Sequence, residues 1–269
     1  MNSPQREIRR VRHEIKQRRL TVEKITAITP RMLRVTLAGA ELAGFTSLGF
    51  DDHIKLFFPK QPADGVQPTA IPGPGQGPES AERPPMRDYT PRYDAAAGRL
   101  HIDFAVHDAG PATDWALRAS VGDSLLIGGP RGSAIIPLEF DWYLFMGDET
   151  ALPAIGRRLE ELPAGSPAVV IAEVEDAAEE QSFPSQARLR VEWVHRRGAP
   201  VGSGEGLLAA LRASEFPPGD CFAWAAAESN VARALRRALI EERGMNRAWV
   251  KAAGYWKRGT AAVHDTIED

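Results

Sequence analysis

The segment Arg87-Asp88-Tyr89-Thr90 combines side chains that suit a flat, phosphorylated cofactor. An arginine can bind a phosphate through two hydrogen bonds, a tyrosine ring can cover a heteroaromatic ring, and a threonine hydroxyl can hydrogen-bond a ring nitrogen. The alternative is an edge strand that carries a surface ion pair. These four residues alone leave both interpretations open.

Two glycine-containing segments stand where a nucleotide phosphate could meet the start of a helix. Gly110 precedes a predicted helix at residues 111–118, and the free N–H groups of a helix N-terminus favour an anion. The segment from Gly147 to Thr150 follows an apolar strand, where nucleotide-binding sheets receive a pyrophosphate. The Gly-x-Gly-x-x-Gly fingerprint is absent, and the carboxylates of Asp148 and Glu149 suit a phosphate poorly, so they could instead cap the next helix.

Three charged residues follow predicted strands further along the chain. Arg196 and Arg197 could clamp a 2′-phosphate, which would favour NADPH over NADH. The alternative, a pair of solvated loop charges, stays open. Glu228 also follows a strand, near the place where a nicotinamide ring is expected to stack.

Composition and motif content argue against several other functions. The net charge of −3 and the pI of about 6.1 disfavour general nucleic-acid binding, and the basic run from Arg6 to Arg19 is interpreted as a solvated face. The hydrolase motif Gly-x-Ser-x-Gly is absent, and the six histidines show no paired metal-ligand spacing. The single cysteine, Cys221, is expected to be an inert core thiol. Because no apolar run of about 18 residues and no signal segment is present, we expect a cytoplasmic protein without membrane insertion.

The elements that must position these residues change in kind near residue 140. Before that point, short β-rich segments are separated by turns, and one helix is predicted at residues 111–118. The predicted strands are Val22–Ile28, Met32–Ala38, His53–Phe58, Leu100–Val106 and Ser124–Gly128. The stretch from Pro59 to Pro85 is rich in Pro and Gly and is predicted to be a long loop. Many short strands with one helix indicate a small antiparallel barrel.

Beyond residue 140, apolar strands alternate with helical patterns. The predicted strands are Trp142–Met146, Ala168–Val174, Leu189–His195, Cys221–Ala227 and Ala248–Ala253. This alternation predicts a doubly wound parallel α/β sheet, which binds ligands at the carboxyl ends of its strands. We therefore expect two domains, at residues 1–139 and 140–269.

Taken in order, the motifs resemble one known family. The segment Arg87-Asp88-Tyr89-Thr90-Pro91-Arg92 is similar to the Arg-x-Tyr-Thr/Ser flavin signature of the ferredoxin-reductase-like superfamily. Four further segments are similar, in the same order, to the siderophore-interacting branch of that superfamily: His107–Ala112 with Trp115, Gly129–Ser133, Gly147–Ala154 and Gly254–Gly259. The resemblance spans about residues 20–260. It implies a six-stranded antiparallel β-barrel that binds FAD, followed by a doubly wound domain that binds a nicotinamide nucleotide.

The resemblance also implies roles for individual residues. Arg87 would contact the FAD phosphates, Tyr89 would pack on the isoalloxazine, and Thr90 would hydrogen-bond its edge. His107 and the turn Gly110-Pro111-Ala112 would hold the pyrophosphate and adenosine parts. The other implied cofactor-binding positions are Trp115 (with core packing as its alternative), Gly132, Ser133, Asp148, Thr150, Arg196 and Glu228. A cationic pocket for an anionic ferric siderophore would be formed by Lys55, Arg131, Lys257 and Arg258.

The activity that the resemblance implies is reduction of a ferric siderophore by FAD, with electrons from NADPH or NADH. Two alternatives stay open: a ferredoxin-dependent or general flavin reductase, and a siderophore-binding partner without catalysis. Two positions depart from the family pattern, since Ala227 and Asp108 both stand where glycine is usual. The added methyl group and the added charge could each weaken cofactor binding.

Overall fold

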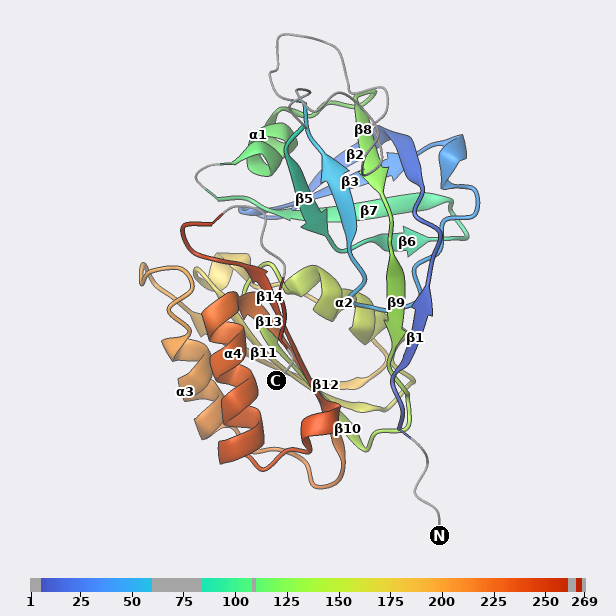
Figure 1. Ribbon diagram of the computed structural model, residues 1–269. Helices are drawn as coiled ribbons and strands as arrows, with labels where there is room; N and C mark the ends of the chain where they lie inside the picture. The colour runs from blue at the N-terminus through green and yellow to red at the C-terminus, as the bar shows by residue number, and fades with distance from the viewer. Residues whose placement is uncertain (1–5, 60–83, 108–109, 261–264, 268–269) are drawn as a thin grey trace. The chain divides into compact units, whose positions relative to one another are not determined.

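The computed structural model describes residues 6–59, 84–107, 110–260 and 265–267 (Figure 1). The chain forms two compact units, one from Arg10 to Ile135 and the other from Ile136 onward together with the N-terminal residues up to Arg9. Most of the loop predicted at 59–85, and Asp108, lie outside the described residues.

The first unit is built on a seven-stranded antiparallel sheet with the order β5-β4-β8-β2-β3-β7-β6. Its strands are β2 (Gln17–Thr29), β3 (Met32–Ala38), β4 (Ile54–Phe57), β5 (Met86–Tyr89), β6 (Arg92–Asp94), β7 (Arg99–Ala105) and β8 (Ser124–Gly128). The expected count of six strands is wrong, because β6 adds an edge strand of three residues, too short to show a period. Within the described ranges β5 and β6 remain the two ends of a curled sheet.

Alternating apolar side chains of these strands form the core of the first unit. Val35 and Leu37 of β3 and Ile54 and Leu56 of β4 are almost fully buried on the same side of the sheet. Helix α1 (Pro111–Arg118) covers part of this core and begins with proline at its first position, where the missing N–H is tolerated. A separate two-stranded ribbon pairs β1 (Arg9–Arg12) with β9 (Gly132–Ile135).

The second unit is a six-stranded sheet with the order β12-β11-β10-β13-β14-β15. The strands are β10 (Trp142–Gly147), β11 (Pro167–Val174), β12 (Arg188–His195), β13 (Cys221–Glu228), β14 (Val250–Trp256) and β15 (Asp265–Ile267). The first five are parallel, as expected, and β15 adds an antiparallel edge that the sequence analysis did not predict.

Helices cover this sheet because its central strands are apolar on both sides. Leu144 and Met146 of β10 share a cluster with residues of α3 (Glu205–Ala213) and α4 (Ser229–Arg237). Tyr143 and Phe145 alternate with them and are also fully buried, so they face the other side of the sheet. The remaining helix, α2 (Leu152–Glu161), follows β10 directly.

The basic N-terminal run is less solvated than predicted. The Arg6 side chain is 10% exposed, its guanidinium lies over the rings of Phe140 and Trp249, and it pairs with Asp220. Arg18 is also buried and donates a hydrogen bond to a backbone carbonyl. The expected solvated face is therefore wrong for these two arginines, whose partners come from distant parts of the sequence. None of the described helices is long and apolar enough to cross a membrane.

Candidate functional site

The predicted flavin signature lies on the edge strand β5, which pairs with β4. Arg87 and Tyr89 share one face of the strand, because side chains alternate along it. The Tyr89 ring centroid is 4.5 Å from that of Phe104, which in turn is 5.6 Å from the ring of Trp115 on α1. Strand β5 and helix α1 therefore pack on the same aromatic side chain. Burial raises the pKa of the Tyr89 hydroxyl, so this group stays neutral.

The two polar residues beside Tyr89 differ in exposure. Arg87 is half-buried, and its guanidinium donates a hydrogen bond to the carbonyl of Met86 at 2.8 Å. Thr90 is 7% exposed at the end of the strand. A guanidinium that is bonded only to a neighbouring carbonyl among the described residues retains donors for an anion.

The N-terminus of α1 has the features of an anion site. Gly110 adopts φ of +139°, and a Cβ at this position would lie 3.5 Å from the His107 ring, so these two predicted residues are adjacent. No side chain caps the helix within the described residues. The Thr113 hydroxyl, at the third helical position, is buried and has no hydrogen-bond partner in the described part of the chain. A buried hydroxyl without a partner is rare, so a bound group fits here. Sequence reasoning missed Thr113, although its place after Gly110-Pro111 marks it.

Three predicted residues of the first unit serve its packing. Trp115 is 8% exposed in the core, in keeping with its alternative interpretation. A Cβ on Gly132 would lie 2.6 Å from the Val11 carbonyl oxygen, so glycine allows β1 and β9 to approach. Ser133 donates to Asp52 at 2.5 Å and lies 2.7 Å from His13 Nε2.

The two predicted cations of the first unit have different surroundings. Lys55 contacts both oxygens of Asp88, at 2.7 and 2.9 Å, so its charge is largely paired across β4 and β5. Arg131 is exposed, and its carbonyl accepts a hydrogen bond from the backbone of His13. Of the two, Arg131 is the more available to a ligand.

In the second unit, Asp148 follows β10 at the point where the strand order reverses. Open α/β sheets bind ligands in the crevice at such a point. The Asp148 carboxylate is 2% exposed and accepts hydrogen bonds from Thr150 N (3.0 Å), Thr150 Oγ1 (2.5 Å) and Trp256 Nε1 (2.8 Å). Burial, followed by the charge of Glu149, raises the pKa of Asp148 to about 7.

Arg196, at the end of β12, is surrounded by carboxylates. Its side chain is 4% exposed, donates to Glu149 at 2.7 and 2.8 Å, and lies 3.5 Å from both Glu173 and Glu175. Burial raises the pKa of Glu173 although Arg196 opposes the shift. Arg197 is exposed, with φ of +51°, and is the only non-glycine residue with positive φ in the described ranges. The adjacent arginines therefore cannot act as an equivalent pair.

Glu228 caps a helix at the end of β13. Its carboxylate accepts hydrogen bonds from Asn230 N at 2.6 Å and Val231 N at 3.2 Å, at the start of α4. Arg258 N approaches the same carboxylate at 3.4 Å, and the Arg258 guanidinium donates to Val201 O at 2.6 Å.

Two further positions of this unit were singled out in the sequence. Lys257, beside Arg258, is exposed. Ala227, one of the departures from the family pattern, is 1% exposed, so its methyl group is already accommodated within the unit.

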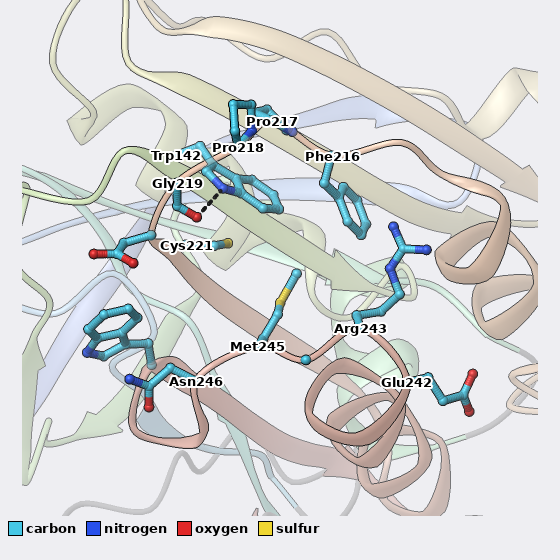
Figure 2. A pocket seen from close by; sticks show the side chains of 13 residues that line it. Trp142, Phe216, Pro217, Pro218, Gly219, Cys221, Glu242, Arg243, Met245 and Asn246 are labelled. Atoms are coloured by element: carbon cyan, nitrogen blue, oxygen red, sulfur yellow. Dashed lines mark hydrogen bonds between the residues drawn. The ribbon is translucent and has the colours of Figure 1, made fainter.

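A pocket of about 630 Å³ opens at the opposite end of the parallel sheet (Figure 2). Its lining includes Trp142 and Cys221, the first residues of β10 and β13, together with Phe216 and Met245. Cys221 is buried and free, and burial raises the pKa of its thiol, in agreement with an inert group. This pocket lies at the amino ends of the strands and contains none of the predicted site residues.

Comparisons with known proteins agree with the motifs. Residues 21–134 match the siderophore-interacting FAD-binding domain, and residues 140–259 match the siderophore-interacting protein family. The NADPH-dependent ferric-chelate reductase of Escherichia coli is 39% identical over 95% of this chain and 99% of its own. The ferric vibriobactin reductase of Vibrio cholerae is 34% identical, with 86% of each chain covered. A siderophore utilization protein from T. fusca has a crystal structure with a TM-score of 0.86 and 42% identity, covering 96% of this chain and 98% of its own. The chain therefore belongs to the siderophore-interacting protein family.

Proposed function

We propose that this protein is an FAD-dependent oxidoreductase that takes electrons from NADPH and reduces the ferric iron of a siderophore in the cytoplasm. When bound, FAD would supply the redox chemistry, by accepting a hydride and passing single electrons to iron. The side chains would bind and orient the reactants, and none is needed as an acid, base or nucleophile. The relatives named as NADPH-dependent and ferric-siderophore reductases support this proposal.

The observation that carries the proposal is that Tyr89 of β5 and Trp115 of α1 both pack on the ring of Phe104. This contact joins the flavin signature to helix α1, whose N-terminus has no side-chain cap and whose Thr113 hydroxyl has no hydrogen-bond partner among the described residues. Tyr89 offers a neutral aromatic ring, Arg87 has guanidinium donors to which no described residue is bonded, and the helix N-terminus offers N–H groups to a pyrophosphate. These features suit a dinucleotide that has a flat ring at one end.

On the donor side, the surroundings of Arg196 change the assignment of a phosphate contact. Because three carboxylates already surround the Arg196 guanidinium, we assign the 2′-phosphate contact to the exposed Arg197 and a supporting role to Arg196. On the acceptor side, we retain Arg131 and Lys257 as cations for an anionic siderophore, with smaller contributions from Lys55 and Arg258, which have partners.

The test uses purified protein and separates the two half-reactions. The protein should carry a visible flavin spectrum, which NADPH should bleach in the absence of oxygen. A ferric siderophore should then restore the oxidised spectrum while a ferrous-specific chelator reports iron reduction. A colourless protein that binds the siderophore would support the non-catalytic alternative. If reduced ferredoxin bleaches the flavin and NADPH does not, the result would support the ferredoxin-dependent alternative.

A further inference from the structure

Asp148 and Trp256 connect two strands across the end of a third. Asp148 follows β10, Trp256 ends β14, and β13 lies between these strands. The hydrogen bond from Trp256 Nε1 to Asp148 Oδ2 (2.8 Å) therefore spans the carboxyl end of β13, where Glu228 stands. It places an indole across the point where the strand order reverses, which is where a doubly wound sheet receives its ligand.

The contacts around this indole are close. A Cβ on Gly202 would lie 2.7 Å from the Trp256 ring, so only glycine leaves room for the indole at that turn. The Trp256 carbonyl accepts a hydrogen bond from Ser229 at 3.2 Å. Asp148, Glu228 and Ser229 are 2%, 3% and 0% exposed. These three groups are therefore closed to a nucleotide in the arrangement in which the indole contacts Asp148 and the Gly202 turn.

We propose that the Asp148–Trp256 hydrogen bond is a latch on the nucleotide crevice, and that the nucleotide enters when the indole leaves Asp148. This inference rests on the proposed function, because it takes a pyridine nucleotide as the electron donor. Asp148 acts on the nucleotide through Trp256 and is a positioning residue.

The latch depends on the proton of Asp148. The ionised carboxylate makes a charge-assisted hydrogen bond with the indole, whereas the protonated group makes a weaker one. Since the pKa of Asp148 is about 7, a fall in pH through this value opens the latch and favours the nucleotide. Glu149 acts directly on this carboxylate and is itself paired with Arg196. The other charged groups at the ends of the neighbouring strands are Glu173, Glu175, Glu228, Lys257 and Arg258.

The experiment measures binding of NADP⁺ to the oxidised, FAD-loaded protein by calorimetry between pH 6 and pH 8.5. NADP⁺ is the probe because it cannot reduce the flavin. In the unmodified protein, Kd should rise with pH above about 7, by at most tenfold per pH unit for one proton. Trp256→Phe keeps an aromatic ring but loses the N–H donor, so Kd at pH 8 should fall roughly tenfold. Asp148→Asn should bind tightly with no pH dependence, because position 148 stays neutral.

Trp193→Phe is the matched control, since Trp193 stacks on Phe183 (5.9 Å) and lies on β12, separated from β10 by β11. It should leave Kd and its pH dependence unchanged, and all three variants should retain FAD. The latch would be overturned if Trp256→Phe and Asp148→Asn both fold but bind NADP⁺ no more tightly than the unmodified protein, with the same pH dependence. That result leaves the proposed function intact if NADPH still bleaches the flavin. If NADPH does not bleach it and NADP⁺ does not bind, the proposed function fails and the latch with it.

Discussion

Replacing Arg196 by methionine tests whether this buried arginine supports the carboxyl ends of β10, β11 and β12. Methionine keeps an unbranched side chain but removes the charge that three glutamates share. Glu173 is the most sensitive of them, because its side chain is 3% exposed and would be left without a counter-charge. Removing one partner of a buried ion pair costs about 3–5 kcal/mol.

Thermal unfolding followed by circular dichroism measures this loss. In domains of 150–250 residues, each kcal/mol lost from the free energy of unfolding lowers the melting temperature by about 2–4 °C. The melting temperature of Arg196→Met should therefore fall by roughly 6–20 °C. The matched variant, Arg197→Met, changes an exposed residue and should cost less than about 0.5 kcal/mol. Two adjacent arginines with the same substitution would thus differ widely in effect.

The pH dependence provides a second test of the same reasoning. The pKa of Glu173 in the folded protein is raised above its ordinary 4.5, so its favourable contribution is present at low pH and declines as the pH rises through the folded-state pKa. Without Arg196 this pKa rises further, and the loss of stability should be smaller at pH 5 than at pH 8. Equal melting temperatures for the two variants, or a loss that does not shrink at low pH, would refute the assignment of Arg196 as a buried support.

Three other outcomes are expected. Arg197→Ala should raise KM for NADPH and leave KM for NADH nearly unchanged, and equal effects on both donors would contradict a 2′-phosphate contact. Arg87→Ala should raise the Kd of FAD roughly 10- to 150-fold, because it removes one charge-assisted hydrogen bond worth about 1.5–3 kcal/mol. Full flavin occupancy of this variant at low FAD concentration would contradict a phosphate contact by Arg87. For an anionic ferric siderophore, kcat/KM of the unmodified protein should fall as salt is added, since the Debye length shrinks from about 10 Å at 0.1 M to about 3 Å at 1 M. Lys257→Ala should make this fall smaller. A neutral ferric chelate is the control, and a slower flavin reduction by NADPH would instead place Lys257 at the donor site.

The regular elements were predictable because their signals are local. The helix at 111–118 and the strands Met32–Ala38 and Ser124–Gly128 have the predicted bounds, since apolar alternation and a proline at the first helical position mark them. The strands that were missed are short, such as β6 and β15 with three residues each. Strands of that length form through pairing with a neighbour, which a single segment does not reveal.

The site was less predictable, because its contacts depend on strand order. The flavin signature is one continuous segment, so Arg87, Tyr89 and Thr90 could be singled out together. In contrast, the hydrogen bond between Asp148 and Trp256 joins residues 108 positions apart in the sequence. The carboxylates around Arg196 come from the ends of β10 and β11, and only the parallel order of β10, β11 and β12 brings them to the arginine.

The distribution of carboxylates at the strand ends also indicates where a dinucleotide's phosphates would bind in the second unit. The N-terminus of α4 is already occupied, because the Glu228 carboxylate accepts its first free N–H groups. The N-terminus of α2 has no side-chain cap within the described residues, and it directly follows the Gly147–Thr150 segment. Since an uncapped helix N-terminus attracts anions and a glutamate-capped one repels them, the pyrophosphate of NADPH is expected at α2.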